Sequence, residues 1–353
     1  MTERAERVEG AAARGGRRYE VVVVGGGAAG LSGALTLARA RRSVLVIDSG
    51  SPRNAPAEGV HTYLGREGLP PAELLATGRR EVTGYGGEIA EGTAVTAERL
   101  ADGGFRVVLD DGSSVVADRL LVTTGLVDEL PDVPGLAERW GREVLHCPYC
   151  HGWEVRDQAI GILAVGPLAV HQALMWRQWS REVTLFQHTA PAFTAEEYEQ
   201  LAARDVTVVD GKVTGLEVTG DRLTGMTLAD GRTVPCRAVV TTARLAARGG
   251  VLAGLGLEPV DAEMAGQVVG SRIDADPFGA TRVPGVWVAG NVTSPVDTVI
   301  AAAAAGVRAG AAINADLTAE ATRRAVAARR DPFSAEAERE VAERVPGDRR
   351  HGL

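Results

Sequence analysis

Residues 19–30 read YEVVVVGGGAAG, a short apolar run followed by a glycine-rich turn. The four valines suit a strand that is buried on both faces in a parallel sheet. The glycines have the spacing G-x-G-x-x-G: Gly25 allows a tight turn, Gly27 lets a pyrophosphate approach the backbone, and Gly30 lets the next helix pack on the strand. Free amide groups at the start of that helix would face the phosphates.

A helical pattern and a second strand continue this unit. The helical pattern runs through Leu31 and Leu35, and the strand over residues 43–47 ends in Asp48. Asp48 comes eighteen positions after Gly30, where a carboxylate can accept hydrogen bonds from an adenosine ribose. Because all these parts have the expected spacing, we predict a dinucleotide site rather than a plain glycine-rich turn.

The chain repeats this plan once. Residues 105–125 read as a hairpin with an Asp-Gly turn, followed by a buried strand that ends in Thr123-Thr124-Gly125. Residues 226–243 have the same order and end in a second Thr-Thr pair. An internal duplication therefore predicts two nucleotide-binding-type units.

The second unit has lost most of the chemistry for binding a dinucleotide. Its glycine loop has become residues 164–169, AVGPLA, with alanine at two glycine positions and a proline that offers no N–H to a phosphate. The following strand ends in Gln187, where the first unit has Asp48, and residues 187–189 include no arginine for a 2′-phosphate. We therefore expect no NADPH binding, with a weak or unconventional NAD(P)H site as the open alternative.

A cysteine pair at the start of the second unit is the main candidate for chemistry. It lies in the sequence HCPYCHGWE, residues 146–154, and cysteines at this spacing can close a small disulfide ring. His146 and His151 flank the pair, and an imidazole can hold or remove a thiol proton near neutral pH. We predict a redox-active disulfide between Cys147 and Cys150.

Half of a zinc site and an inert pair are the alternatives for these cysteines. Zinc would need two more ligands, and the third cysteine, Cys236, stands in a strand with no histidine beside it. We expect Cys236 to be a small buried apolar residue and expect no metal site.

Two other segments have candidate cofactor contacts. Residues 286–291, VWVAGN, read as a strand and a glycine turn, and residues 297–317 read as an alanine-rich helix. Small side chains would let a flavin lie against the start of this helix; a plain buried helix is the alternative. Residues 51–71 read as a loop that contains Arg53, Asn54, His61 and Arg66, of which His61 is kept as a candidate; solvated loop residues are the alternative.

Composition limits the classes of function. The chain has 353 residues, 45% hydrophobic and 24% charged, so we expect a large core and two domains. The net charge of −8 argues against a nucleic-acid partner, which needs a basic face. The long apolar segment over residues 286–315 is interrupted by polar residues, so no membrane span is expected. Residues 1–18 lack the apolar run of a signal peptide, and we expect a disordered tail and a cytoplasmic protein.

Over about residues 19–317 these parts together resemble the low-molecular-weight thioredoxin reductases. Within that group the chain looks most like the FAD-dependent dithiol oxidases that close disulfides in gliotoxin- and holomycin-type natural products, because of the sequence CPYCHGWE and the degraded second glycine loop. Thioredoxin reductases typically have aspartate after the second cysteine, where this chain has His151. Their closing turn usually carries aspartate, where this chain has Asn291.

The resemblance implies an α/β fold with two Rossmann-like, three-layer ββα nucleotide-binding domains. A discontinuous FAD-binding domain would cover residues 19–129 and 250–320, and an NAD(P)H-binding-like domain with the cysteine pair would cover residues 130–249. Residues 1–18 and 321–353 would be tails, the second a solvated charged helix with a frayed end. The expected FAD contacts are Gly25, Gly27, Ala28, Ala29, Gly30, Asp48, Thr124, Gly125, Gly290, Asn291 and Val299.

The resemblance also implies roles at the redox site. Cys147 would exchange with a small-molecule dithiol, Cys150 would face the flavin, His151 would be the base, and His146 is a weaker candidate. The product would be an intramolecular disulfide, with O2 as electron acceptor and H2O2 as by-product, in antibiotic biosynthesis by a homodimer. An NADPH-dependent reductase of thioredoxin or another disulfide, and a flavin redox sensor without turnover, are the alternatives.

Overall fold

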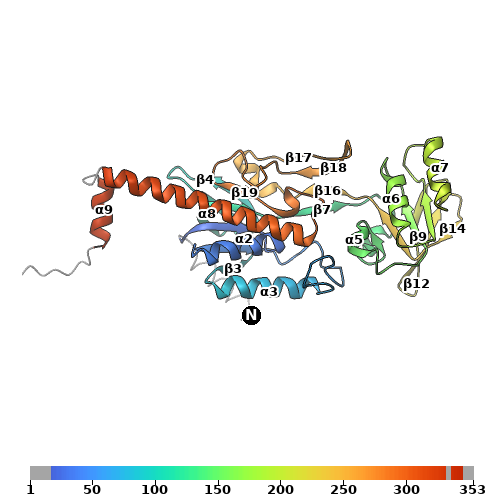
Figure 1. Cartoon of the computed structure of the whole chain (residues 1–353), viewed down its shortest axis with the longest axis horizontal. Coiled ribbons are helices and arrows are strands. Elements are labelled where there is room, and N and C mark those ends of the chain that lie inside the picture. The colour runs from blue at the N-terminus through green and yellow to red at the C-terminus, as the bar shows by residue number, and fades with distance from the viewer. Residues whose placement is uncertain (1–16, 331–334, 345–353) are drawn as a thin grey trace, which may run out of the picture.

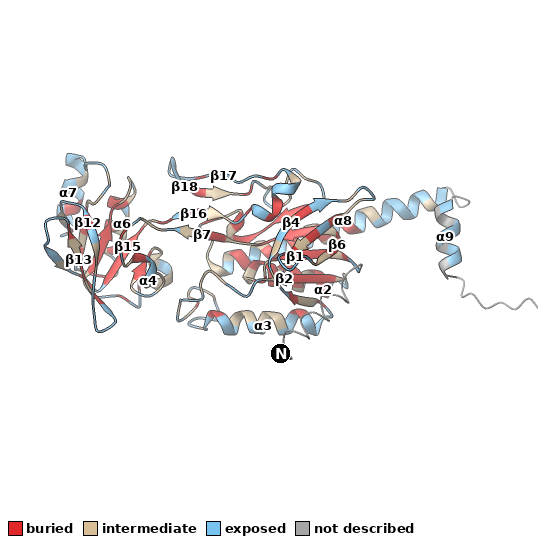
Figure 2. Cartoon of the chain, turned by 180° about the vertical axis from the view of Figure 1, so that it is seen from behind, coloured by how far each residue is buried: buried red, intermediate tan, exposed pale blue. Residues whose placement is uncertain are grey.

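The computed structural model describes residues 17–330 and 335–344. Two α/β units lie next to each other, and strands β7 (Leu126–Glu129) and β16 (Arg244–Ala247) connect them (Figure 1). Figure 2 shows that the central strands of both units are buried, whereas the far end of helix α8 (Val299–Arg330) is exposed.

The first unit is built on a seven-stranded sheet. Its order is β3-β2-β1-β6-β5-β4, and β19 pairs with β6 beside β5. The parallel part of this sheet consists of β1, β2, β3, β6 and β19. Strands β4 and β5 form an antiparallel hairpin, and β5 is also antiparallel to β6. Their bounds are β1 (Arg18–Val24), β2 (Val44–Asp48), β3 (Glu88–Glu91), β4 (Ala94–Arg99), β5 (Phe105–Leu109), β6 (Ser114–Val122) and β19 (Val286–Val288).

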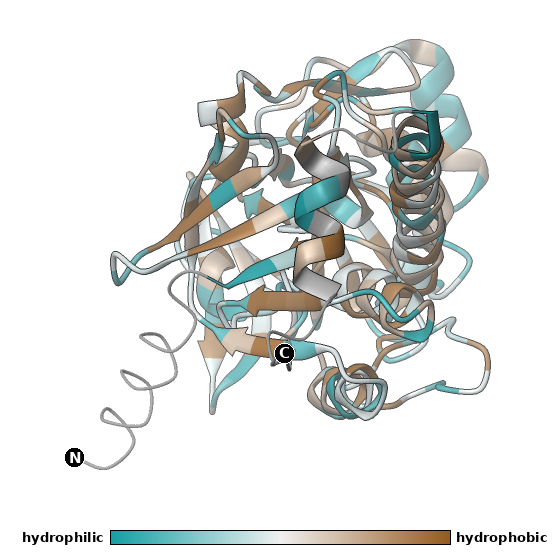
Figure 3. Ribbon diagram, turned by 90° about the vertical axis from the view of Figure 1, so that its left-hand side faces the viewer, coloured by the Kyte–Doolittle hydropathy of each residue, from teal (hydrophilic) through white to brown (hydrophobic). Residues whose placement is uncertain are grey.

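The valine run of β1 separates two cores. Val21 and Val23 pack with residues of helices α2 (Ala28–Arg39) and α8, whereas Val22 and Val24 pack on the other face with β4, β5 and the 3-10 helix η1 (Gly250–Leu255). All four valines are at most 3% exposed, and burying one such side chain contributes roughly 1.5–3 kcal/mol. In the end-on view of Figure 3, long helices seen along their axes lie to the right of the strands.

Small residues let α8 lie directly on α2. A Cβ on Gly306 would stand 1.9 Å from the carbonyl oxygen of Ala29, and one on Gly310 would stand 2.8 Å from that of Gly33. Bulkier side chains would hold the two helices apart. The alanine- and glycine-rich sequence of α8 therefore serves helix packing, and the start of the same helix lines the cavity described below.

The second unit repeats this plan. Its parallel sheet has the order β11-β10-β9-β15-β8, and β12-β13-β14 form an antiparallel sheet against it. The strands are β8 (Val144–Leu145), β9 (Ile160–Leu163), β10 (Val183–Phe186), β11 (Thr207–Val209), β12 (Val213–Thr219), β13 (Arg222–Leu228), β14 (Thr233–Pro235) and β15 (Ala238–Thr241). The helices are α4 (Leu136–Arg139), α5 (Pro148–His151), α6 (Ala169–Trp176) and α7 (Ala195–Ala203).

The two connecting strands belong to a further sheet. Its order is β17-β18-β16-β7, with β17 (Val260–Met264) and β18 (Gln267–Arg272). Just before β7, the Thr124 hydroxyl donates to the carbonyl oxygen of Arg248 at 2.7 Å, and the N–H of Arg248 donates to that of Gly125 at 3.0 Å. Both passes of the chain between the units are thus tied together, by the antiparallel pairing of β16 with β7 and by these two hydrogen bonds.

The predicted α/β class with two Rossmann-like units is confirmed. One boundary was wrong. Arg17 and Arg18 are not part of a disordered tail, since β1 begins at Arg18 and both side chains form ion pairs. The solvated charged helix expected beyond residue 320 is observed, and over residues 321–330 it continues the helix expected over residues 297–317 without a break, as the exposed end of α8. Helix α9 (Ala335–Arg344) follows, and the rest of the predicted tails, residues 1–16 and 345–353, lies outside the described residues.

Candidate active site

One cavity of about 830 Å³ brings the glycine loop and the cysteine pair together. This volume is in the range of pockets for small molecules and cofactors. Of the residues predicted from the sequence, all but Gly30 line it: Gly25, Gly27, Ala28, Ala29, Asp48, Thr124, Gly125, His146, Cys147, Cys150, His151, Gly290, Asn291 and Val299. The glycine loop and the cysteine pair, which lie far apart in the sequence, therefore line the same cavity.

The glycine loop fits a pyrophosphate. Helix α2 starts after Gly27 without a capping side chain from the described residues, and a Cβ on Gly27 would meet none of their atoms within 4 Å. The amides of the first turn are thus accessible from the cavity. Gly25 has a φ of 106°, which only glycine adopts readily, and a Cβ on Gly30 would stand 1.9 Å from the Gly25 carbonyl oxygen. Gly30 therefore acts through packing, outside the cavity wall.

Asp48 lies at the end of β2 beside the loop. Its Oδ1 accepts the Gly26 N–H at 3.0 Å, and its Oδ2 accepts a hydrogen bond from Arg79 on helix α3 (Pro71–Gly84). A carboxylate has about four acceptor positions, so ribose hydroxyls can still bind. Arg79 was not predicted, because nothing in its local sequence indicates a partner 31 positions away.

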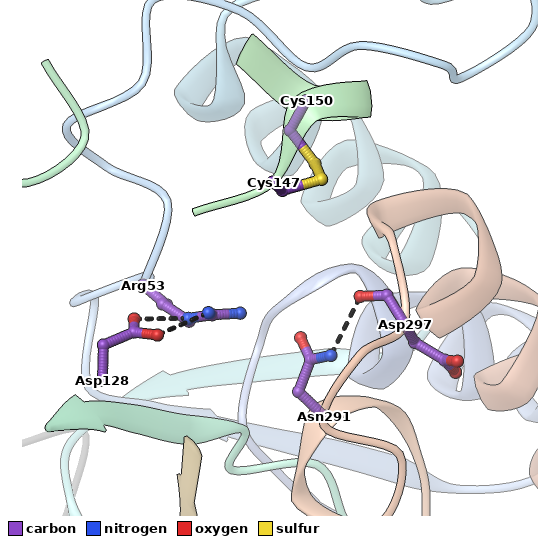
Figure 4. Close-up of a disulfide and its surroundings, with 6 residues drawn as sticks. All are labelled: Arg53, Asp128, Cys147, Cys150, Asn291 and Asp297. Atoms are coloured by element: carbon purple, nitrogen blue, oxygen red, sulfur yellow. Dashed lines mark hydrogen bonds and ion pairs between the residues drawn. A yellow bond between two sulfur atoms is a disulfide. The ribbon is translucent and has the colours of Figure 1, made fainter. Parts of the chain in front are cut away.

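Asn291 holds the chain that leads into α8. Its Nδ2 donates to the backbone carbonyl oxygens of Ser294 at 3.0 Å and Pro295 at 3.2 Å. It also donates to that of Asp297 at 2.9 Å (Figure 4). This turn places Val299 and the start of α8 at the cavity wall. None of the described residues donates to Oδ1 of Asn291, which leaves that atom as an acceptor for a ligand hydroxyl.

Cys147 and Cys150 form a disulfide at the start of α5, with their Cα atoms 5.3 Å apart. Figure 4 shows the disulfide on one side of the cavity, opposite Asn291. Cys236 differs in every respect: it is buried among Met226 and other apolar residues, and burial raises the pKa of its thiol to about 12. It has neither the thiolate character nor the access that exchange requires.

The two flanking histidines are not equivalent. Burial lowers the pKa of His151, and although the nearby Glu154 opposes this, the ring is neutral at pH 7 and can accept a thiol proton. Burial, together with the charge of Arg53, lowers the pKa of His146 to about 4. His146 also stacks on Trp140, with ring centroids 5.5 Å apart. His151 is therefore the better base of the two.

An ion pair that the sequence did not predict lies in the cavity wall. Nε and Nη2 of Arg53 each donate to one carboxylate oxygen of Asp128 at 2.6 Å (Figure 4). Arg53 stands in the loop after β2 and Asp128 in β7, 75 positions later.

No group of three or more metal-binding side chains is found in residues 17–330 and 335–344. None of the helices in these ranges is both long and apolar enough to cross a membrane.

The family of the chain follows from a comparison with known proteins. The pyridine nucleotide-disulphide oxidoreductase family matches residues 19–310. The chain belongs to this family. It is therefore an oxidoreductase, and the family implies a flavin cofactor, which the glycine loop fits.

Individual relatives agree. The chain is 33% identical over 282 residues to thioredoxin reductase tcpT of Claviceps purpurea, covering 77% of this chain and 86% of the relative. It is 29% identical to thioredoxin reductase sirT of Leptosphaeria maculans, covering 84% and 93%. The crystal structure of HlmI has a TM-score of 0.81 and 45% identity over 89% of this chain and 97% of that one. These matches confirm the resemblance to thioredoxin reductase-like flavoproteins of the gliotoxin and holomycin type.

Proposed function

We propose that this flavoprotein is a dithiol oxidase that forms an intramolecular disulfide in a small molecule, with O2 as electron acceptor and H2O2 as by-product. The observation that carries the proposal is the Cys147–Cys150 disulfide, which lines the same cavity as the glycine loop. A dithiol that enters this cavity meets an oxidant, a neutral imidazole and a cofactor site together. Opposite the disulfide, Gly27 and the first turn of α2 would hold the pyrophosphate of FAD and Asp48 its ribose.

The cysteine pair performs thiol–disulfide exchange. His151 takes the proton of one substrate thiol, and the resulting thiolate attacks Sγ of Cys147, so that Cys150 leaves as a thiolate. The second substrate sulfur then displaces Cys147 and closes the product disulfide. When bound, FAD would accept the two electrons from the cysteine pair and pass them to O2.

The second unit supports an oxidase over a nicotinamide-dependent reductase. At the end of β10, Nδ1 of His188 accepts the N–H of Val213 at 3.1 Å. Burial and the charge of Lys212 lower the pKa of His188, so its ring offers no positive charge to a 2′-phosphate. In the degraded loop before α6, Pro167 stands where a backbone N–H would meet a phosphate.

An NADPH-dependent disulfide reductase is the second candidate, because relatives such as tcpT and sirT carry the name thioredoxin reductase. An oxygen electrode separates the candidates. We expect sustained O2 consumption and H2O2 formation with a small dithiol and no nucleotide, lost in Cys147→Ser and Cys150→Ser and retained in Cys236→Ala. No O2 consumption with dithiols, combined with NADPH-dependent reduction of disulfides, would favour the reductase. A flavin sensor would show neither.

Two further expectations belong to this proposal. We propose that the FAD-binding domain comprises residues 19–129 and 250–320 and the cysteine-bearing domain residues 130–249, and that the protein is a homodimer. Sedimentation velocity of the holoenzyme tests the homodimer.

A further inference from the structure

Oxidation of a dithiol releases two protons, and the site described so far has one suitable base. Each substrate thiol must lose a proton before its sulfur can attack. His151 can take one of them. His146 cannot take the other near neutral pH, because its ring is buried, stacked on Trp140 and has a pKa of about 4.

His61 is a third histidine of the same cavity, and it comes from the other unit. It lines the cavity together with Cys147, from the loop between β2 and α3. Its Nδ1 lies 2.7 Å from Oε1 of Glu67, whose Oε2 also accepts the N–H of Thr62 at 2.8 Å. Glu67 thus fixes both the ring and the tautomer in which Nδ1 carries the hydrogen.

The opposite nitrogen of the ring is arranged to receive a proton. Nε2 of His61 lies 3.5 Å from Oε1 of Glu154, four positions after Cys150. With the hydrogen on Nδ1, Nε2 carries the lone pair and is the nitrogen that can accept a proton. Proton uptake at Nε2 turns this contact into an ion pair and leaves the imidazolium between two carboxylates, Glu67 and Glu154. The titratable groups that face the ring are these two carboxylates and, further away, the neutral imidazole of His151.

We propose that His61 is a second catalytic residue of the proposed dithiol oxidation, the base that deprotonates the second substrate thiol at Nε2. The inference rests on the proposed function. His151 serves the first thiol and His61 the second, so each unit contributes one base to the exchange.

The two steps balance. In the first, one substrate thiol gives its proton to His151, its sulfur bonds to Sγ of Cys147, and the Cys147–Cys150 bond breaks with its electron pair on Cys150. In the second, the other thiol gives its proton to His61, its sulfur bonds to the first substrate sulfur, and the bond to Cys147 breaks with its electron pair on Cys147. The substrate has lost two electrons and two protons. The cysteine pair holds the electrons as two thiolates, and the two imidazoles hold the protons.

The test compares His61→Gln with wild type and with His171→Gln, an exposed histidine on α6 outside the cavity. Oxidised holoenzyme is mixed without oxygen with dithiothreitol, or with the monothiol 2-mercaptoethanol, and flavin absorbance is followed. Parallel samples are quenched in acid, and mass spectrometry measures the mixed disulfide on Cys147. With dithiothreitol we expect His61→Gln to reduce the flavin about 100-fold more slowly and to accumulate the mixed disulfide. With 2-mercaptoethanol, formation of the mixed disulfide should match that of wild type.

The outcomes separate this inference from the proposed function. If dithiothreitol does not reduce the wild-type flavin, the proposed function fails and the inference fails with it. If it reduces wild type and His61→Gln equally fast, or if His61→Gln slows the monothiol step as much as the dithiol step, only the role of His61 is wrong. Glu67→Gln is the second variant should His61→Gln lose its flavin: a slowed second step supports the inference, and an unchanged one overturns it.

Discussion

Arg53 and Asp128 join the loop after β2 to the strand that leads out of the first unit, through two parallel hydrogen bonds of 2.6 Å. The Asp128 side chain is 7% exposed and that of Arg53 25% exposed. The pair forms part of the cavity wall on which His146 and the disulfide also lie. The loop over the cofactor site and the connection between the units are thereby held in one arrangement.

The ion pair of Arg53 with Asp128 is expected to stabilise the fold. Asp128→Asn leaves the partly buried guanidinium with a weaker partner, so we expect the free energy of unfolding to fall by about 1–3 kcal/mol. The neighbouring Glu129 forms a half-exposed pair with Arg244 and is the matched control. Glu129→Gln should change stability by less than about 1 kcal/mol. Denaturant unfolding of both variants measures the difference, and equal effects would contradict the structural role of Arg53.

Two glycines of the nucleotide loop should respond differently to alanine. Gly30→Ala puts a Cβ against the Gly25 carbonyl oxygen, so we expect a loss of about 3 kcal/mol in stability. Gly27 has a φ of −76° and open space, so alanine should leave the apoprotein stable. The added methyl group would occupy the approach of the pyrophosphate and raise the FAD dissociation constant more than about 10-fold, or ~1.4 kcal/mol. Thermal unfolding of the apoproteins and FAD titration test this pair, and unchanged FAD binding in Gly27→Ala would contradict the placement of the pyrophosphate.

Asn291→Asp tests the turn before α8. The carboxylate cannot donate to the carbonyl oxygens of Ser294, Pro295 and Asp297, so we expect about 1–3 kcal/mol of local destabilisation and weaker FAD binding. Hydrogen exchange of residues 290–299 and FAD titration measure both effects. Ser294→Ala removes only the hydroxyl bond to Asp297 and should have a smaller effect. A protected turn in Asn291→Asp would show that the amide donor is dispensable.

A pH dependence of stability follows from His146. Its pKa is about 4 in the folded protein and ~6.5 in the unfolded chain, so the unfolded state binds the extra proton first. The contribution of the neutral His146 ring to the free energy of unfolding is fully present above pH 6.5. It is lost as the pH falls toward 4, which lowers the free energy of unfolding by about 3 kcal/mol. His146→Phe, which can still stack on Trp140, should flatten this part of the curve of unfolding free energy against pH. An unchanged slope in His146→Phe would mean that His146 has the same pKa in the folded and unfolded states, and would contradict its burial as a neutral ring.

Local sequence patterns predicted much of the first unit. The valine run, the glycine spacing and Asp48 place β1, α2 and β2 within a few residues of their observed positions, since strand burial and helix starts depend on adjacent residues. The duplicated plan placed the second unit in the same way. The cysteine pair and His151 were singled out because their spacing is itself the signal.

Contacts between distant segments were not predictable in this way. Arg53 with Asp128, Arg79 with Asp48, and His61 with Glu154 join residues whose partners no local pattern specifies. The sheet of β17, β18, β16 and β7 was missed for the same reason, because its strands are short and come from both sides of the second unit. A solvated charged helix was expected beyond residue 320, but its continuity with α8 was not, because the exposed residues 321–330 have no apolar face to indicate packing.

In the proposed reaction, electrons enter at the cysteine pair from a small dithiol and not from a nicotinamide. The most direct measurement is anaerobic stopped-flow spectroscopy of the oxidised holoenzyme, mixed with one equivalent of dithiothreitol or one equivalent of NADPH. We predict that dithiothreitol bleaches the flavin absorbance, that Cys147→Ser abolishes this bleaching, and that NADPH leaves the flavin oxidised on the same timescale. Rapid bleaching by stoichiometric NADPH, with no reduction by the dithiol, would contradict the account.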